Sequence, residues 1–144
     1  MMIQFLAAFI GTAAFALLFG VEKEYYFYCG LIGGIGRIFY VWLTGSFAIT
    51  ESTFFTTLVI IFLSRFFAVR KKCPSTIFVV SGILPLVPGA GIYWMAYYFV
   101  INKIELASKN GFSALKIAVA IVLGIVFIFE LPQKIFTIGL KENR

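Results

Sequence analysis

Few residues in this chain could do chemistry, and two common types are missing. The 144 residues include no histidine and no aspartate. Zinc sites, Ser–His–Asp triads and histidine proton relays need these side chains, so the sequence argues against all three and predicts no metal or other cofactor. Six glutamates remain, and four of them lie outside the apolar runs: Glu22, Glu24, Glu105 and Glu142. Hydrolytic or metal-dependent catalysis therefore has little to work with, and we expect that the chain is not an enzyme.

The most unusual stretch is SGILPLVPGAGIY, residues 81–93, which places two prolines and three glycines inside an apolar run. Proline has no N–H, so Pro85 and Pro88 should leave the carbonyls of Ser81 and Leu84 without their helical donors. Unpaired carbonyls cost several kcal/mol in lipid. The segment is therefore expected to face protein or a water-filled cavity.

A helix that restarts after Pro88 would begin with unpaired N–H groups near the middle of the bilayer. Half-helix N-termini of this kind bind anionic groups in secondary transporters, and glycines let a ligand approach the backbone closely. The alternative is a plain proline kink that only helps packing. We predict a substrate site at this break, formed by Pro85, Pro88, Gly89, Ala90 and Gly91.

Arg37 is a second candidate for substrate binding, because a charge inside an apolar run is a functional hypothesis by default. It lies within the run 26–44, and residue counting puts it at a depth similar to the PLVPG break. The alternatives are that it snorkels outward or pairs with Glu51. Arg65 is near the end of its own run, where snorkelling is the expected behaviour.

Two glutamates within or beside apolar runs are candidates for ion coupling or for an ion pair. Glu51 follows Thr50, which is expected to cap the third helix, and an acid suits the first turn of a helix. Glu130 lies near the end of the last apolar run, where it could pair with Lys134 or belong to a proton path. The sequence leaves these alternatives open.

The elements that position these residues are membrane helices. The chain is 62% hydrophobic and 12% charged, which is the composition of a membrane protein. A span needs about 20 apolar residues, and continuous runs of that length are helical because lipid offers the backbone no partners. We expect a single all-α integral membrane domain, 1–144, with five transmembrane helices, the fourth broken at PLVPG: about 2–20, 26–44, 52–68, 77–101 and 113–131.

Glycines are concentrated in the second run. Gly30 and Gly34 form a GxxxG pattern, which predicts close packing of this helix against a neighbour. No strand precedes them, so a nucleotide-binding loop is excluded.

The charge pattern predicts an orientation in the membrane. The net charge of +6 is carried by short basic clusters between apolar runs, which favours positive-inside topology over nucleic-acid binding. With five spans, the N-terminus is expected outside and the C-terminus in the cytoplasm. If 77–101 were re-entrant, the tail would lie on the other side. The predicted cytoplasmic residues are Lys23, Arg70, Lys71, Lys72, Lys134, Lys141 and Arg144, and the predicted outer ones are Lys103, Lys109 and Lys116.

The order of these features resembles the threonine/serine exporter family. The glycine-rich second run, the third run ending in SRFFAVRKKCPS and the block GILPLVPGAGIY carry the resemblance, over about residues 10–100. The most specific part is PLVPG followed by Tyr93, which adds Tyr93 to the predicted substrate site. The chain looks most like the small, stand-alone C-terminal half of that family. Arg37 stands where some relatives have histidine, so their proton-handling role is not carried over.

The resemblance implies a secondary transporter in a bacterial cytoplasmic membrane that exports small amino acids such as threonine and serine. In split members it implies dicarboxylates such as succinate. Such members pair a small protein with a larger subunit that has its own five spans, and we expect that partner here. The expected ligand is a small carboxylate-bearing metabolite. The competing hypotheses are a non-transporting membrane scaffold or accessory protein and, with less support, a membrane-embedded enzyme.

Overall fold

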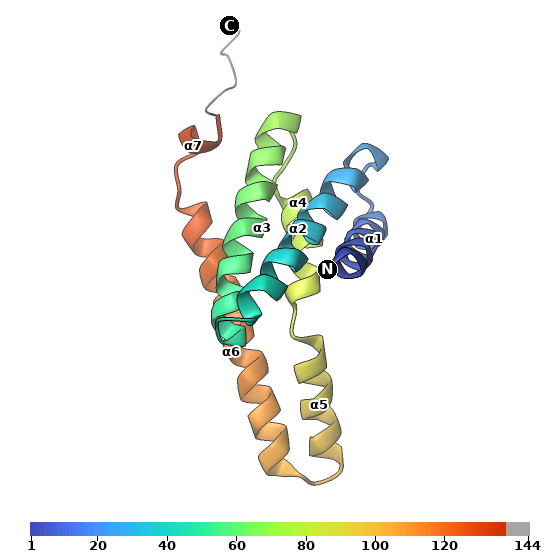
Figure 1. Ribbon diagram of the computed structural model, residues 1–144, viewed down its shortest axis with the longest axis vertical. Coiled ribbons are helices and arrows are strands. Elements are labelled where there is room, and N and C mark those ends of the chain that lie inside the picture. Colours follow the sequence, from blue (N-terminus) through green and yellow to red (C-terminus); the bar gives the residue numbers. More distant parts are fainter. Residues whose placement is uncertain (138–144) are drawn as a thin grey trace, which may run out of the picture.

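The computed structural model describes residues 1–137, and within them the chain is helical without strands. Figure 1 shows a bundle of helices, a long helix that runs along it, and a hairpin that extends beyond one end. The elements in chain order are α1 (Met2–Leu18), η1 (Lys23–Tyr25), α2 (Tyr26–Thr44), α3 (Ile49–Lys71), α4 (Thr76–Ile83), η2 (Leu84–Leu86), α5 (Gly89–Val100), α6 (Ile104–Phe129) and α7 (Lys134–Thr137).

The prediction of five spans is wrong in number. Three helical segments are long and apolar enough to cross a bilayer: Lys23–Thr44, Ile49–Lys71 and Ile104–Phe129. The fourth candidate is the pair Thr76–Leu86 and Gly89–Val100, which is bent by 49° at the break. Helix α1 has only 17 residues, or about 26 Å at 1.5 Å per residue, which is less than the hydrocarbon thickness of about 30 Å.

Several predicted boundaries also change. Helix α2 covers the predicted 26–44, whereas α3 is longer than the predicted 52–68 at both ends. Its N-cap is Ala48, whose side chain has no oxygen, so the expected cap by Thr50 is wrong. The expected loop over 102–112 is instead the first part of α6, which begins at Ile104. Polar residues there suggested a loop, but they lie on a helix that packs against α5.

The glycines of α2 allow α1 to pack closely against it, as the GxxxG pattern predicted. A Cβ atom at Gly33 would lie 2.0 Å from Thr12 Oγ1, and one at Gly34 would lie 2.4 Å from the ring of Phe5. At Gly30 the nearest atom would be the ring of Phe9 at 2.9 Å. Helices in lipid gain stability mainly from such close packing, since lipid is as apolar as their side chains.

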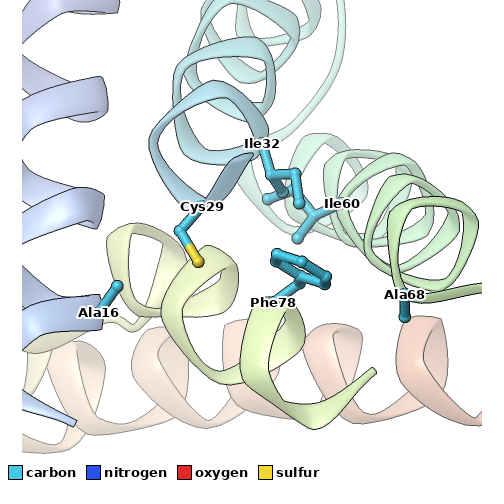
Figure 2. Close-up of a cluster of buried hydrophobic side chains, with 6 residues drawn as sticks. All are labelled: Ala16, Cys29, Ile32, Ile60, Ala68 and Phe78. Atoms are coloured by element: carbon cyan, nitrogen blue, oxygen red, sulfur yellow. The ribbon is translucent and has the colours of Figure 1, made fainter. Parts of the chain in front are cut away.

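The core of the bundle is centred on Phe78 of α4, which is fully buried. Figure 2 shows its ring between α2 and α3, close to Ile32 and Ile60. The rings of Tyr25 and Tyr28 pack against it edge-on, at centroid distances of 5.7 and 6.4 Å. The other members of this cluster come from α1, α2 and α3: Ala16, Cys29 and Ala68.

The hairpin formed by α5 and the first part of α6 extends beyond the bundle (Figure 1). Residues Thr50 and Glu51 at the start of α3 line the same groove as Lys116 of α6. Residues 104–115 therefore extend about 18 Å past the start of α3, at 1.5 Å per residue. No residue of α5 is buried, and its main contacts are with α6. One side of α5 thus packs on α6 and the rest is exposed.

We predict that Gly33→Ala will destabilise the protein, because the added methyl would overlap Thr12. The expected loss is about 1–3 kcal/mol of unfolding free energy, typical of overpacking. The matched control is Gly11→Ala on α1, where a Cβ meets nothing within 4 Å. The control should be neutral or slightly stabilising, since alanine favours a helix over glycine. Thermal unfolding in detergent compares them, and equal melting temperatures would contradict the close packing of α1 on α2.

Candidate functional site

The break at PLVPG is present, and its backbone polar groups are partly satisfied within the break itself. The N–H of Val87 donates to the carbonyl of Leu84 at 3.2 Å, closing a 3₁₀ turn. The N–H of Gly89 donates to the carbonyl of Val87 at 2.7 Å. Two expectations are therefore wrong: Leu84 does not lose its donor, and the N–H of Gly89 is not free. A tighter turn supplies the hydrogen-bond donors that proline, which has no N–H group, cannot provide.

Two N–H groups at the start of α5 remain without a hydrogen-bond acceptor in the described part of the chain. Helix α5 begins at Gly89 with Pro88 as its N-cap, and the first bond back to the cap is from Ile92 to the carbonyl of Pro88, at 3.1 Å. Within residues 1–137 the N–H groups of Ala90 and Gly91 have no backbone acceptor outside the helix. The positive end of the helix dipole and these two donors could bind a carboxylate.

The residues predicted around the break differ in what they contact. Gly89 faces open space, since a Cβ there would meet nothing within 4 Å. A Cβ on Gly91 would lie 3.3 Å from the Cβ of Ala114, so this glycine serves the packing of α5 on α6. Tyr93 is 62% exposed and stacks on Tyr97 at 6.5 Å between centroids. Of the three, Gly89 has the most open approach for a ligand.

Arg37 lies on α2 and is partly buried. Its guanidinium carbon is 5.7 Å from the centre of the Tyr40 ring, a weak cation–π contact. Within the described part of the chain it has no hydrogen bond to a side chain or backbone and no ion pair, so the alternative of a pair with Glu51 is not seen. The charge of Arg37 is therefore available to a ligand.

Packing places Arg37 and the break at a similar depth. A Cβ at Gly36 would lie 2.6 Å from Ile60, and one at Gly82 would lie 2.9 Å from the same side chain, so these three residues form one layer across α2, α3 and α4. Figure 1 shows α2 and α4 running in the same direction from this layer and α3 in the opposite one. Arg37 follows Gly36 directly, and the break begins two residues after Gly82.

Two hydroxyl groups of α3 were missed by sequence reasoning. Ser52 and Thr56 are fully buried, and their hydroxyl oxygens have no hydrogen-bond partner. Their neighbours Thr53 and Thr57 do bond, each to the carbonyl four residues before it. Thr56 is one turn from Ile60, about 6 Å towards the level of the break. A buried hydroxyl without a partner costs about 1–3 kcal/mol, which makes these two groups candidates for binding a polar ligand.

The comparison with known proteins assigns the family. Residues 4–130 match the family described as "Threonine/Serine exporter, ThrE". The chain belongs to this family. An uncharacterized protein of Haemophilus influenzae is 33% identical over 89 residues, which are 61% of this chain and 30% of the relative. The chain thus spans less than a third of the length of that relative. No solved structure gives a significant match.

In this exporter-family chain the two glutamates lie outside the break itself, Glu51 on α3 and Glu130 at the end of α6. Glu51 is in the first turn of α3 as expected, and it lines a groove of about 750 Å³ between α3 and α6 that also includes Lys116. Glu130 is exposed at the end of α6 and forms no ion pair with Lys134 among the described residues. A role of either glutamate in ion coupling stays a prediction.

Arg65 does not snorkel, which corrects the sequence-based expectation. Its side chain is only 8% exposed. One guanidinium nitrogen, Nη1, donates to the carbonyl of Ile128 and to that of Leu131 at 3.1 Å. Its carbon lies 4.5 Å from the centre of the Phe136 ring. Arg65 therefore turns inward because the last carbonyls of α6 need donors that the helix cannot supply.

We predict that Gly89→Leu will leave the fold intact, whereas Gly91→Leu will loosen the α5–α6 hairpin. The first side chain would enter open space, and the second would press on Ala114. The expected difference in unfolding free energy is about 1–3 kcal/mol, as for other overpacked sites. Thermal unfolding in detergent measures it. Equal destabilisation by both changes would show that Gly89 is also a packing residue.

Proposed function

We propose that this chain is the small membrane subunit of a two-component secondary transporter that exports small carboxylate-bearing metabolites. The candidates are amino acids such as threonine and serine, or dicarboxylates such as succinate. Membership in an exporter family supports transport rather than catalysis. The observation that carries the proposal is the break between η2 and α5, where two backbone N–H groups at a helix start are left without partners.

The substrate carboxylate binds at this break. The N–H groups of Ala90 and Gly91 donate to one carboxylate oxygen, and the guanidinium of Arg37 approaches the charge from α2. Discontinuous helices bind substrate carboxylates in this way in other secondary transporters. The unpartnered hydroxyls of Ser52 and Thr56, at a similar depth on α3, then face the polar remainder of the substrate. The contact between Gly36, Ile60 and Gly82 supports this arrangement.

The partner is a larger family subunit, and it covers α5. This helix has no buried residue, although it is apolar and aromatic. In the Haemophilus influenzae relative the matched region accounts for only 30% of the length, so other parts of that chain accompany it. Transporter sites usually lie between two structural repeats, and a second set of spans would enclose the open side of the break. The exposed aromatic residues available for this contact are Tyr93, Trp94, Tyr97 and Phe99.

Efflux measurements test the proposal directly. Bacterial cells that lack their own exporters are loaded with labelled threonine, serine or succinate, and efflux is followed with this chain alone, the larger subunit alone, and both together. We expect export only when both are expressed. Robust transport by the purified single chain in liposomes would disprove the two-component arrangement. Efflux unchanged by either chain would favour a scaffold.

Substitutions at the break identify the binding groups. Arg37→Gln should weaken carboxylate binding by about 1.5–3 kcal/mol, the worth of a hydrogen bond to a charged group. Arg37→Lys should recover little if the contact is bidentate. Gly89→Leu should block access without loss of assembly, and Pro88→Ala should lower efflux by partly straightening the helix. Wild-type efflux from well-folded Arg37→Gln and Gly89→Leu would show that the break is only architectural.

We also infer the location and orientation. The protein resides in the bacterial cytoplasmic membrane, with its N-terminus outside and its C-terminus inside. Support comes from the end of the bundle where α2 and α4 begin and α3 ends (Figure 1). Half of the basic residues in the described chain lie at this end. They are Lys23, Arg70, Lys71, Lys72 and Lys134. Lys141 and Arg144, assigned to the same side from the sequence, lie outside the described residues.

Thiol labelling tests this orientation with the native cysteines. Cys29 is fully buried, while Cys73 in the α3–α4 turn is partly exposed. A membrane-impermeant maleimide should not label intact cells and should label them after permeabilisation. Burial raises the pKa of the Cys73 thiol, so the reaction needs mildly alkaline buffer. Lys103→Cys, in the α5–α6 turn, is the matched control and should react in intact cells. The opposite pattern would reverse the orientation.

A further inference from the structure

A second polar cleft lies at the basic end of the bundle, away from the break. It has a volume of about 420 Å³ and is bounded by the α3–α4 turn and by the link between α6 and α7. The polar residues that line it are Arg65, Lys72, Cys73, Ser75, Thr76 and Gln133. Among residues 1–137, no carboxylate side chain lines this cleft.

Arg65 provides a buried positive charge that lines this cleft. Both of its hydrogen bonds are made by Nη1, to the carbonyls of Ile128 and Leu131. Its Nε and Nη2 groups have no acceptor within residues 1–137, and no carboxylate of that part of the chain forms an ion pair with it. Removing a cation from water is costly unless an anion or hydrogen-bond acceptors replace the water. The carbonyls satisfy part of this need, and an anion in the cleft would satisfy the rest.

The start of α4 also lines this cleft and supplies further donors. Ser75 is the N-cap of α4, and its side chain makes no capping hydrogen bond. The first bonds of the helix are made by the N–H groups of Ile77 and Phe78, so those of Ser75 and Thr76 have no backbone acceptor in the described chain. Lys72, in a left-handed conformation with φ 54°, ends α3 beside them and is exposed. A helix start and a lysine thus line the same cleft as the buried guanidinium.

We propose that this cleft binds a phosphate group. A phosphate has several oxygens that can accept from donors on different walls at once, and the cleft brings together a guanidinium, an ammonium, hydroxyls and a helix N-terminus. The phosphate belongs either to an anionic phospholipid headgroup, for which basic pockets between membrane helices are suited, or to a free phosphate compound. Because this site is separate from the break, it does not depend on the proposed transport activity.

The native thiol of Cys73 reports on occupancy, because it lines the cleft and the only other cysteine, Cys29, is fully buried. The full chain is placed in nanodiscs of zwitterionic lipid, and the rate of Cys73 modification by an uncharged maleimide is measured. Inorganic phosphate is added in one arm and phosphatidylglycerol replaces part of the lipid in another. The third arm is a control with sodium chloride at the same ionic strength as the phosphate. At a phosphate concentration ten times its Kd, modification should slow by about tenfold.

Two lysine variants separate binding in the cleft from general attraction to a basic surface. Lys72→Gln removes a cation that lines the cleft and should weaken phosphate protection by about tenfold, the usual effect of losing one charged hydrogen bond. Lys71→Gln is the matched control, since it removes the same charge from the adjacent position. The Lys71 ammonium lies 4.6 Å from the centre of the Tyr28 ring and does not line the cleft. Protection of this variant should be unchanged.

The arms of the experiment also identify the source of the phosphate. Protection by inorganic phosphate supports a site for free phosphate compounds, and protection by phosphatidylglycerol alone supports a lipid headgroup site. The proposal is overturned if neither slows the reaction, if chloride protects equally well, or if Lys71→Gln and Lys72→Gln lose protection to the same degree. Arg65→Gln is not used, because Arg65 also holds the end of α6.

Discussion

Backbone carbonyls in a lipid environment need hydrogen-bond donors, and this need accounts for most of the unusual features of the structure. At the break, the N–H of Val87 reaches the carbonyl of Leu84, and a tighter turn replaces the bond that Pro88 cannot make. At the end of α6, the side chain of Arg65 supplies donors to two carbonyls. At both sites, carbonyls that a regular helix would leave without a donor accept a hydrogen bond from another part of the chain.

The polar groups inside the described part of the protein fall into two sets, those with a hydrogen-bond partner and those without one. Several hydroxyls inside the bundle bond to the carbonyl four residues earlier, as Thr57 and Ser64 do. The hydroxyls of Ser52 and Thr56, the first N–H groups of α5, and the guanidinium of Arg37 have no such partner among residues 1–137. The hydroxyls of Ser52 and Thr56 and the guanidinium of Arg37 lie near the depth of the break. Together with the N–H groups of α5, they are the groups most available to bind a polar ligand.

Close packing around α2 holds these groups at one depth. Without side chains at Gly33 and Gly36, α1 and α3 approach the backbone of α2, and Gly82 lets α4 meet the same layer. Helix α5 then departs by 49° and packs mainly on α6. The chain is therefore closely packed on one side of the break and open on the other, which is where a partner subunit in our proposal would complete the site.

The sequence by itself determined the all-helical class, the extent of α2, the close approach at its glycines and the existence of the break. These depend on local chemistry: apolar run length, the absence of a Cβ, and the missing N–H of proline. Only the tertiary structure decided how many helices are long enough to span, that 104–112 is helical, and that Arg65 turns inward while Arg37 stays unpaired. Those outcomes depend on which neighbour offers a surface or a hydrogen-bonding partner, and a carbonyl 63 residues away in the chain leaves no trace in the sequence around Arg65.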